Sequence, residues 1–174
     1  MRISTKRAWA AGLCILFIVT GAYGQSVNAP EEDEAIILIS QIYEEVSSDG
    51  STPVDWDLIR SFFLEEAVIV LRSSAQDHTV FTLDGFIQDF KEFYENPVVK
   101  ESGFREQIVR IKPQIYRNAA SIGVVYEAGI LGSERPPQQG IDFWILVRKD
   151  EQWKVIGISN EIIPPGQEIP DYFD

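Results

Sequence analysis

The sequence is poor in the side chains that most often carry nucleophilic catalysis and metal binding. Its 174 residues include one cysteine, Cys14, and one histidine, His78. A single cysteine can form neither an intrachain disulfide nor a multi-thiolate metal site. A single histidine excludes His-rich metal centres, and any Ser-His or Cys-His pair would have to use this one residue. His78 stands in the polar segment AQDHT, so we interpret it as an exposed loop residue. The sequence therefore predicts no metal site and no cofactor.

Positive charge and nucleotide-binding motifs are also scarce. Lys and Arg number 15 against 27 Asp and Glu, which gives a formal net charge of −12. Such an acidic surface repels phosphate backbones and anionic lipids, so we expect no binding to nucleic acid or to a membrane surface. The motifs GxSxG, HExxH, the P-loop and GxGxxG are absent as well. These absences argue against the hydrolase, zinc-protease and nucleotide-binding chemistries that those motifs carry.

The first 24 residues have the pattern of a secretory signal peptide. Basic residues precede an apolar stretch over 8–19, and small residues follow it before Gln25. The stretch is shorter than the ~20 apolar residues of a transmembrane helix, and a cleavage pattern follows it. We therefore predict cleavage after Gly24 and export to the periplasm or the medium, with no membrane attachment afterwards. Cleavage would remove Cys14, so the exported chain would depend on its apolar core for stability.

The residues that follow predict three helices and a strand. Apolar side chains recur at helical spacing over 30–47, again over 55–63, and again over 82–94. Pro30, Asp55 and Thr82 suit the starts of these helices, because proline fixes φ and the polar side chains can accept hydrogen bonds from free backbone N–H groups. The run over 67–71 predicts a strand that is buried on both faces, and the residues over 72–81 predict a polar loop.

Strand-like segments fill the second half of the chain. We predict four of them, at 104–116, 120–130, 141–149 and 153–160, joined by hairpin turns. Helices followed by an antiparallel sheet are typical of the α+β class. The prediction is one cone-shaped domain over residues 25–160, in which three N-terminal helices pack against a curved, mainly antiparallel sheet, with a C-terminal tail over 161–174. Pro113 cannot donate to a strand ladder, so the first of the four strands should be bulged or lie at an edge there.

The segment 141–149 carries large apolar groups on both faces. Ile141, Phe143 and Ile145 alternate with Asp142, Trp144 and Leu146. One face can cover the helices, and the other then needs a partner of its own. Exposed apolar patches usually mark interfaces, so the sequence predicts a homodimer through the outer face of the sheet.

Several segments resemble proteins of one superfamily. These are VDWDLIRSFFLEEAVIV, TLDGFIQDFKEFY, AASIGVVYEAG and QGIDFWILVRKDEQWKVIGIS. They are similar to nuclear transport factor 2-like proteins, in the SnoaL-like and ketosteroid-isomerase-like group, over nearly all of 31–160. The resemblance implies a conical pocket between sheet and helices, used for isomerisation, cyclisation, dehydration or simple binding.

The resemblance also implies positions for a catalytic set. The isomerases use a carboxylate base on the strand after the second helix, a tyrosine on the first helix and a protonated aspartate on a later strand. Tyr43 matches the tyrosine, whereas Leu71 stands where the base is expected. The aspartate position falls near Ile145, and Asp142 lies three residues away on the opposite strand face. Loss of the base removes a contribution of ~10²–10⁴-fold, which argues against steroid isomerisation.

The candidate site residues are two strand carboxylates and a set of aromatic side chains. Glu127 and Asp142 would become acid–base groups if they faced into the cone, because burial would raise their pKa values. Alternatively, they lie on the outer face or pair with Arg148 or Arg110. Side chains that could line a pocket, or that could equally fill the core, are Tyr43, Trp56, Phe90, Tyr126 and Phe143.

Two functions remain open from the sequence. The missing base favours an exported binding or interaction module without a catalytic set, holding a small apolar ligand or a partner. The alternative is a small cofactor-independent isomerase, cyclase or dehydratase acting on an apolar carbonyl compound, with Tyr43, Asp142 or Glu127 as acid–base groups. An open cavity of ~300 Å³ with an inward carboxylate would support the enzyme, and a cavity filled by Trp56 and Phe90 would exclude it.

Overall fold

The computed structural model describes residues 29–72 and 76–173, and the predicted signal peptide over 1–24 lies outside them. The elements in chain order are α1 (Ala29–Glu45), α2 (Trp56–Ser61), β1 (Phe63–Arg72), β2 (His78–Thr82), α3 (Leu83–Tyr94), α4 (Pro97–Ser102), β3 (Phe104–Tyr116), β4 (Ala119–Ile130), β5 (Gln138–Lys149), β6 (Gln152–Ile162) and the 3₁₀ turn η1 (Asp171–Phe173). No helix of this described part is long and apolar enough to cross a membrane.

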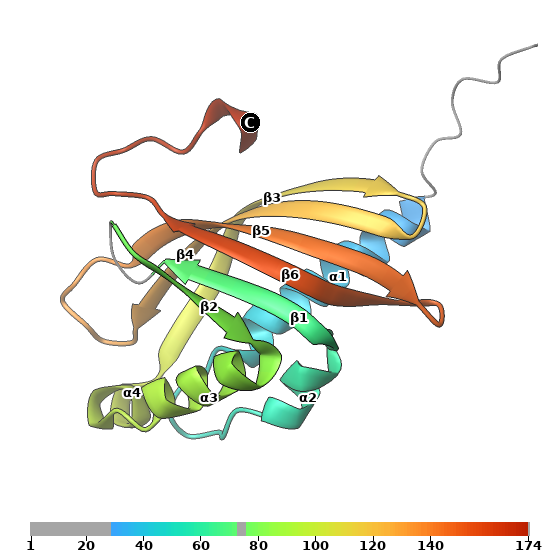
Figure 1. Cartoon of the computed structure of the whole chain (residues 1–174). Helices are drawn as coiled ribbons and strands as arrows, with labels where there is room; N and C mark the ends of the chain where they lie inside the picture. The colour runs from blue at the N-terminus through green and yellow to red at the C-terminus, as the bar shows by residue number, and fades with distance from the viewer. Residues whose placement is uncertain (1–28, 73–75, 174) are drawn as a thin grey trace, which may run out of the picture.

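The strands form one curved sheet in the order β2-β1-β6-β5-β4-β3. All neighbours pair antiparallel except β1 and β6, which run parallel in the middle of the sheet. In Figure 1, α1 crosses the concave side of the sheet, while α2, α3 and α4 gather at one end of it. The α+β class and the curved sheet are therefore as predicted, with a mixed strand arrangement.

Two elements correct the predicted outline. The described residues form four α-helices rather than the three predicted, because Asn96 caps the short helix α4 and Pro97 opens it. The segment 72–81, predicted as a loop, contains the edge strand β2, which pairs with β1 from Val68↔Thr82 to Arg72↔His78. An edge strand that faces solvent has no apolar row to bury, so its sequence looks like a polar loop.

The predicted helix starts are confirmed. The Asp55 side chain accepts hydrogen bonds from the backbone N–H groups of Asp57 and Leu58 at 3.1 and 2.9 Å. The Thr82 hydroxyl accepts one from the Gly85 N–H at 3.2 Å. These caps fix where α2 and α3 begin, and α3 carries two of the aromatic side chains discussed below. Pro113 lies on the edge strand β3, also as predicted.

The main core fills the space between α1 and the concave face of the sheet. Its fully buried side chains come from both halves of the chain and include Ile39, Ile59, Ile69, Leu83, Ile122, Val124, Leu146 and Val155. The part of the core next to α3 is aromatic, and the ring centroids of Phe63 and Phe86 are 6.1 Å apart there. This packing holds α1 and α3 against the sheet and leaves a hollow between them.

The C-terminal tail covers part of the convex, outer face. Phe173 packs with Val125, Ile141 and Ile163 in a second apolar cluster, and it lies so close over Gly123 that a Cβ there would be 2.9 Å from its ring. Figure 1 shows the tail returning over the sheet after β6. Other outer side chains stay exposed, notably Val68 at 50%, Ile145 at 45% and Phe143 at 42%. The outer face is thus divided between a covered part and an open apolar part.

Candidate active site

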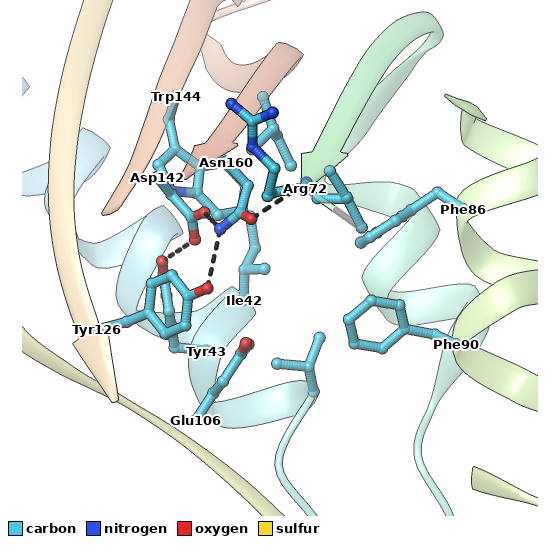
Figure 2. Close-up of a pocket in the computed structure, with 13 residues that line it drawn as sticks. Ile42, Tyr43, Arg72, Phe86, Phe90, Glu106, Tyr126, Asp142, Trp144 and Asn160 are labelled. Carbon is cyan, nitrogen blue, oxygen red and sulfur yellow. Dashed lines mark hydrogen bonds between the residues drawn. The ribbon is translucent and has the colours of Figure 1, made fainter. Parts of the chain in front are cut away.

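A cavity of about 140 Å³ lies between α1, α3 and the concave face of the sheet. One end of it is polar and the other apolar, as Figure 2 shows. The side chains that line it are Ile42, Tyr43, Val46, Leu71, Arg72, Phe86, Phe90, Glu106, Tyr126, Asp142, Trp144, Ile158 and Asn160. Two carboxyl groups therefore share one cavity with aromatic and aliphatic walls.

Asp142 is the centre of the polar end. The Tyr43 hydroxyl donates to its Oδ2 at 2.5 Å, and the Asn160 amide donates to its Oδ1 at 2.8 Å. Asn160 uses its second amide hydrogen on the Tyr126 hydroxyl oxygen, also at 2.8 Å. Both Asp142 oxygens are therefore held by donors, and the carboxyl group has a fixed orientation in the cavity (Figure 2).

The sheet register brings these residues together. Asp142 on β5 is the direct partner of Asn160 on β6, and Tyr126 on β4 is the partner of Gly140. Tyr126 lies against Gly140 so closely that a Cβ at that position would be 2.3 Å from its hydroxyl oxygen. The backbone N–H of Arg72, at the end of β1, donates to Asn160 Oδ1 at 3.4 Å. The absence of a side chain at Gly140 thus leaves room for the Tyr126 ring. The hydrogen bond from the Arg72 backbone on β1 fixes the orientation of the Asn160 amide.

Burial dominates the electrostatics of Asp142. The side chain is 8% exposed, and loss of water raises its pKa to about 6, although the hydrogen bonds from Tyr43 and Asn160 act in the opposite direction. The pKa of Tyr43 is raised well above its usual value by burial, and next by the nearby Asp142 charge. At neutral pH the site therefore contains a mostly ionised carboxylate held by a protonated tyrosine.

Glu106 is the second carboxyl group of the cavity. It reaches the cavity from β3, where its backbone is tied to Ser47 of the loop after α1 by hydrogen bonds of 3.0 and 3.2 Å. Burial raises its pKa to about 8, with a further contribution from the Asp142 charge. Within residues 29–72 and 76–173, its carboxyl group has no hydrogen-bonding side chain as a partner. Glu106 is therefore mostly protonated at neutral pH and able to donate to a bound molecule.

Glu106 and Tyr43 also separate the cavity from a surface hollow. That hollow is lined by both residues together with Ser40, Glu44, Ser47, Arg105, Gln107 and Ile108. Protons lost or gained by Glu106 thus have a short route to solvent.

The opposite end of the cavity is apolar. Phe86 and Phe90 on α3 face it with ring centroids 4.8 Å apart, and Trp144 stands 5.9 Å from Tyr43. Among the described residues, Arg72 is the one cationic side chain in the lining, and its guanidinium is bonded to the Glu161 carboxylate at 3.1 and 2.5 Å. The described site thus combines two acid–base groups and a hydrophobic wall with a single arginine that is already paired.

The structure brings together four of the sequence-predicted site residues. Tyr43, Phe90, Tyr126 and Asp142 all line the cavity. Leu71, which occupies the position expected for the isomerase base, lines it as an apolar side chain. The carboxyl groups therefore reach the cavity from β3 and β5, whereas the resemblance expected one on the strand after the second helix.

Three predicted residues lie elsewhere. Phe143 is exposed on the outer face of β5, because neighbours on a strand point to opposite sides and Asp142 points inward. Trp56 packs edge-on against Tyr94 at 5.6 Å, away from this cavity. Glu127 accepts hydrogen bonds from Gln107 and Gln139 at 3.1 and 2.8 Å and is not among the residues that line the cavity.

Glu106 and Asn160 are the functional candidates that sequence reasoning missed. Glu106 follows Phe104 and precedes Ile108 in an alternating row that faces the core, so a charged residue there was a readable signal. The bulge between Ile108 and Arg110 breaks the alternation after that point and conceals the row. Asn160 ended the predicted strand 153–160, whereas β6 continues to Ile162, and only the register with Asp142 shows its role.

The described part of the chain contains no cluster of three or more His, Cys, Asp or Glu that could hold a metal ion.

Comparison with known proteins identifies the fold. No protein-family model matches the sequence, and no curated protein matches it. Among solved structures, a nuclear transport factor 2-like protein of unknown function from Shewanella baltica is similar over 80% of this chain and 98% of its own, with a TM-score of 0.54 and 15% identity. A protein from Novosphingobium aromaticivorans, provisionally named a scytalone dehydratase, is similar over 82% and 91%, with a TM-score of 0.60 and 14% identity.

A second protein from Novosphingobium aromaticivorans, described as nuclear transport factor 2-like with a cystatin-like fold, matches 79% of this chain and 84% of its own. Its TM-score is 0.63 and its identity 10%. The chain therefore has the nuclear transport factor 2-like fold, as the resemblance in its sequence indicated. At these identities the likeness concerns the fold, and the site has to be interpreted from its own residues.

Proposed function

We propose that the protein is a small cofactor-independent enzyme that transfers protons within an apolar carbonyl compound, of the isomerase, cyclase or dehydratase type. The observation that carries this proposal is the presence of Asp142 and Glu106 in one cavity with a hydrophobic wall. Their pKa values of about 6 and about 8 lie on either side of neutrality. At pH 7 one group is therefore mostly a base and the other mostly an acid, which is the arrangement that acid–base catalysis needs.

The proposed step uses both groups and needs no further reactant. The Asp142 carboxylate takes a proton from the carbon next to a carbonyl group, and the electron pair of that C–H bond forms the enol double bond. Glu106 gives its proton to the carbonyl oxygen, so no free enolate has to exist. Return of a proton to the same or another carbon restores the carbonyl compound and both carboxyl groups. The hydrogen bonds from Tyr43 and Asn160 hold Asp142 in place throughout.

The test measures proton exchange at carbon, with cyclohexanone as the probe. The protein is incubated with cyclohexanone in D₂O, and deuterium entry beside the carbonyl group is followed by NMR. We expect exchange above the buffer rate and a fall of ~10²–10⁴-fold in Asp142→Asn. Glu127→Gln is the matched control, because Glu127 is a strand carboxylate outside the cavity. Equal exchange in wild type, Asp142→Asn and buffer would overturn the proposal.

A non-catalytic binding module is the second candidate, because two observations favour it. The cavity of about 140 Å³ is smaller than the open cavity of ~300 Å³ that would support an enzyme. Both Asp142 oxygens already accept hydrogen bonds, and such a carboxyl group could serve only to orient a bound ligand. Ligand binding without carbon exchange would support this binding module and reject the enzyme.

We further propose that the protein acts outside the cytoplasm, as the N-terminal pattern over 1–24 predicts, and that it forms a homodimer. The open part of the outer face, with Val68, Phe143 and Ile145, supports the dimer because these exposed apolar side chains lie on one face, on the two strands β1 and β5 that flank β6. The tail cluster around Phe173 would border this interface.

A further inference from the structure

The size of the cavity restricts the compound that it can hold. Its volume is about 140 Å³, and an apolar cavity of about 150 Å³ in another protein accommodates benzene. Typical sites for drug-sized ligands begin at ~300 Å³. One six-membered ring therefore fits, whereas a fused bicyclic or steroid skeleton is too large unless the walls move.

The polar end offers hydrogen bonds to an oxygen atom. Asn160 donates to the Tyr126 oxygen, so the hydroxyl hydrogen of Tyr126 is not used in that bond. A protonated Glu106 supplies a second donor in the same lining. A ligand without any oxygen would cover these donors and leave them unpaired, which costs free energy.

Charge excludes anions from this cavity. Its lining contains two carboxyl groups, and the one cationic side chain that the described residues contribute, Arg72, is bonded to Glu161. The whole chain has a formal charge of −12. A carboxylate or phosphate ligand would therefore enter a negative site without a free counter-charge.

We propose that the cavity binds a neutral compound built on a single six-membered ring with one hydroxyl or ketone oxygen. The ring lies against Phe86 and Phe90, and the oxygen lies at the end formed by Tyr126 and Glu106. The inference rests on the proposed function for the location of its site, and it adds the class of compound.

The first experiment compares probes that differ in one property each. The protein is titrated at pH 7 with phenol, toluene, benzoate and 2-naphthol, and binding is followed by chemical shifts of backbone amides along α3 and β5. We expect phenol to bind and to shift these signals, toluene to bind at least 10-fold more weakly, and benzoate and 2-naphthol to leave them unchanged. Tighter binding of benzoate, toluene or 2-naphthol than of phenol would overturn the assignment.

A second experiment changes the size of the cavity. Phe90 is partly buried and lines the apolar wall, so Phe90→Ala should enlarge the space. We expect this variant to gain binding of 2-naphthol while it still binds phenol, and this gain cannot come from unfolding. Val80→Ala, on the exposed edge strand β2, is the control and should behave as wild type. Binding of 2-naphthol to wild type and Val80→Ala as well as to Phe90→Ala would contradict the size limit.

The two proposals fail in different ways. Phenol binding without deuterium exchange into cyclohexanone rejects the enzyme and leaves the ligand class intact. Deuterium exchange that Asp142→Asn abolishes, together with a preference for 2-naphthol, rejects the ligand class and leaves the enzyme intact.

Discussion

The hydroxyl of Tyr43 on α1 donates a hydrogen bond of 2.5 Å to Asp142 on β5, across 99 residues of sequence. This bond joins the first helix to the middle of the sheet and lies at the polar end of the cavity. It also lowers the pKa of Asp142 against the effect of burial. The position of α1 and the protonation of Asp142 are thus linked.

Removal of this hydroxyl should make Asp142 a weaker acid. In Tyr43→Phe the bond that favours the ionised form is lost, so we expect the pKa of Asp142 to rise above its value of about 6. The protein should also lose about 1–3 kcal/mol of unfolding free energy, because a buried acceptor loses its donor. Carboxyl carbon NMR titration and urea unfolding measure the two effects. In the control Tyr94→Phe, which loses a bond to the backbone of Val46 instead, the Asp142 pKa should stay unchanged.

Glu106 should make the folded state less stable as pH rises. Its pKa is about 8 in the folded protein, above the ordinary value, so between about pH 4.5 and 8 the folded state binds more protons than the unfolded state. The contribution of Glu106 to the unfolding free energy is fully present below about pH 4.5 and is lost as the pH rises through this window. The unfolding free energy falls by at most about 1.4 kcal/mol per pH unit from this group. We expect Glu106→Gln to flatten the decline in unfolding free energy over this window. A decline as steep in Glu106→Gln as in Glu127→Gln would refute the assignment.

Gly140 should be required for the placement of Tyr126. A Cβ at Gly140 would be 2.3 Å from the Tyr126 hydroxyl oxygen, so Gly140→Ala must displace that ring or the strand. We expect a loss of about 1–3 kcal/mol in unfolding free energy and weaker phenol binding. Gly129→Ala is the matched control, since a Cβ there has its nearest neighbour at 3.6 Å on Pro137. Calorimetry of both variants would show whether close packing at Gly140, rather than any glycine in a strand, is responsible.

The open outer face should determine the oligomeric state. A charge at Phe143, which is 42% exposed on that face, would be buried in the proposed homodimer. We expect Phe143→Glu to sediment as a monomer at concentrations where the wild type sediments as a dimer. Val98→Glu, on α4 at a distance from this face, should leave the dimer intact. A wild-type monomer at millimolar concentration would reject the dimer.

Local patterns in the sequence predicted the helices and most strands. The caps at Asp55 and Thr82 were readable because each polar side chain stands directly before an apolar periodic run. β2 could not be predicted in this way, because an exposed edge strand needs no apolar alternation. The parallel pairing of β1 with β6 could not be predicted either, since it joins segments about 90 residues apart and no local pattern encodes it.

The site was predictable only in part, for a related reason. Asp142 and Phe143 are adjacent on one strand, so the sequence alone predicts that their side chains face opposite sides of β5 and cannot both line one pocket. Which face is the inner one depends on how the whole sheet curves. Asn160 and Glu106 join the site through register and a bulge, which are properties of strand pairs and not of single segments.

The place of β6 in the sheet has a consequence for biosynthesis. β6 is the last strand of the described residues, yet it lies between β1 and β5 and supplies Asn160 to the cavity. Until residue 162 has left the ribosome, β6 cannot join the pair β2-β1 to the group β5-β4-β3. A nascent chain that lacks β6 cannot form the continuous sheet or the complete cavity, so we expect the sheet and the site to be completed together, once β6 is available.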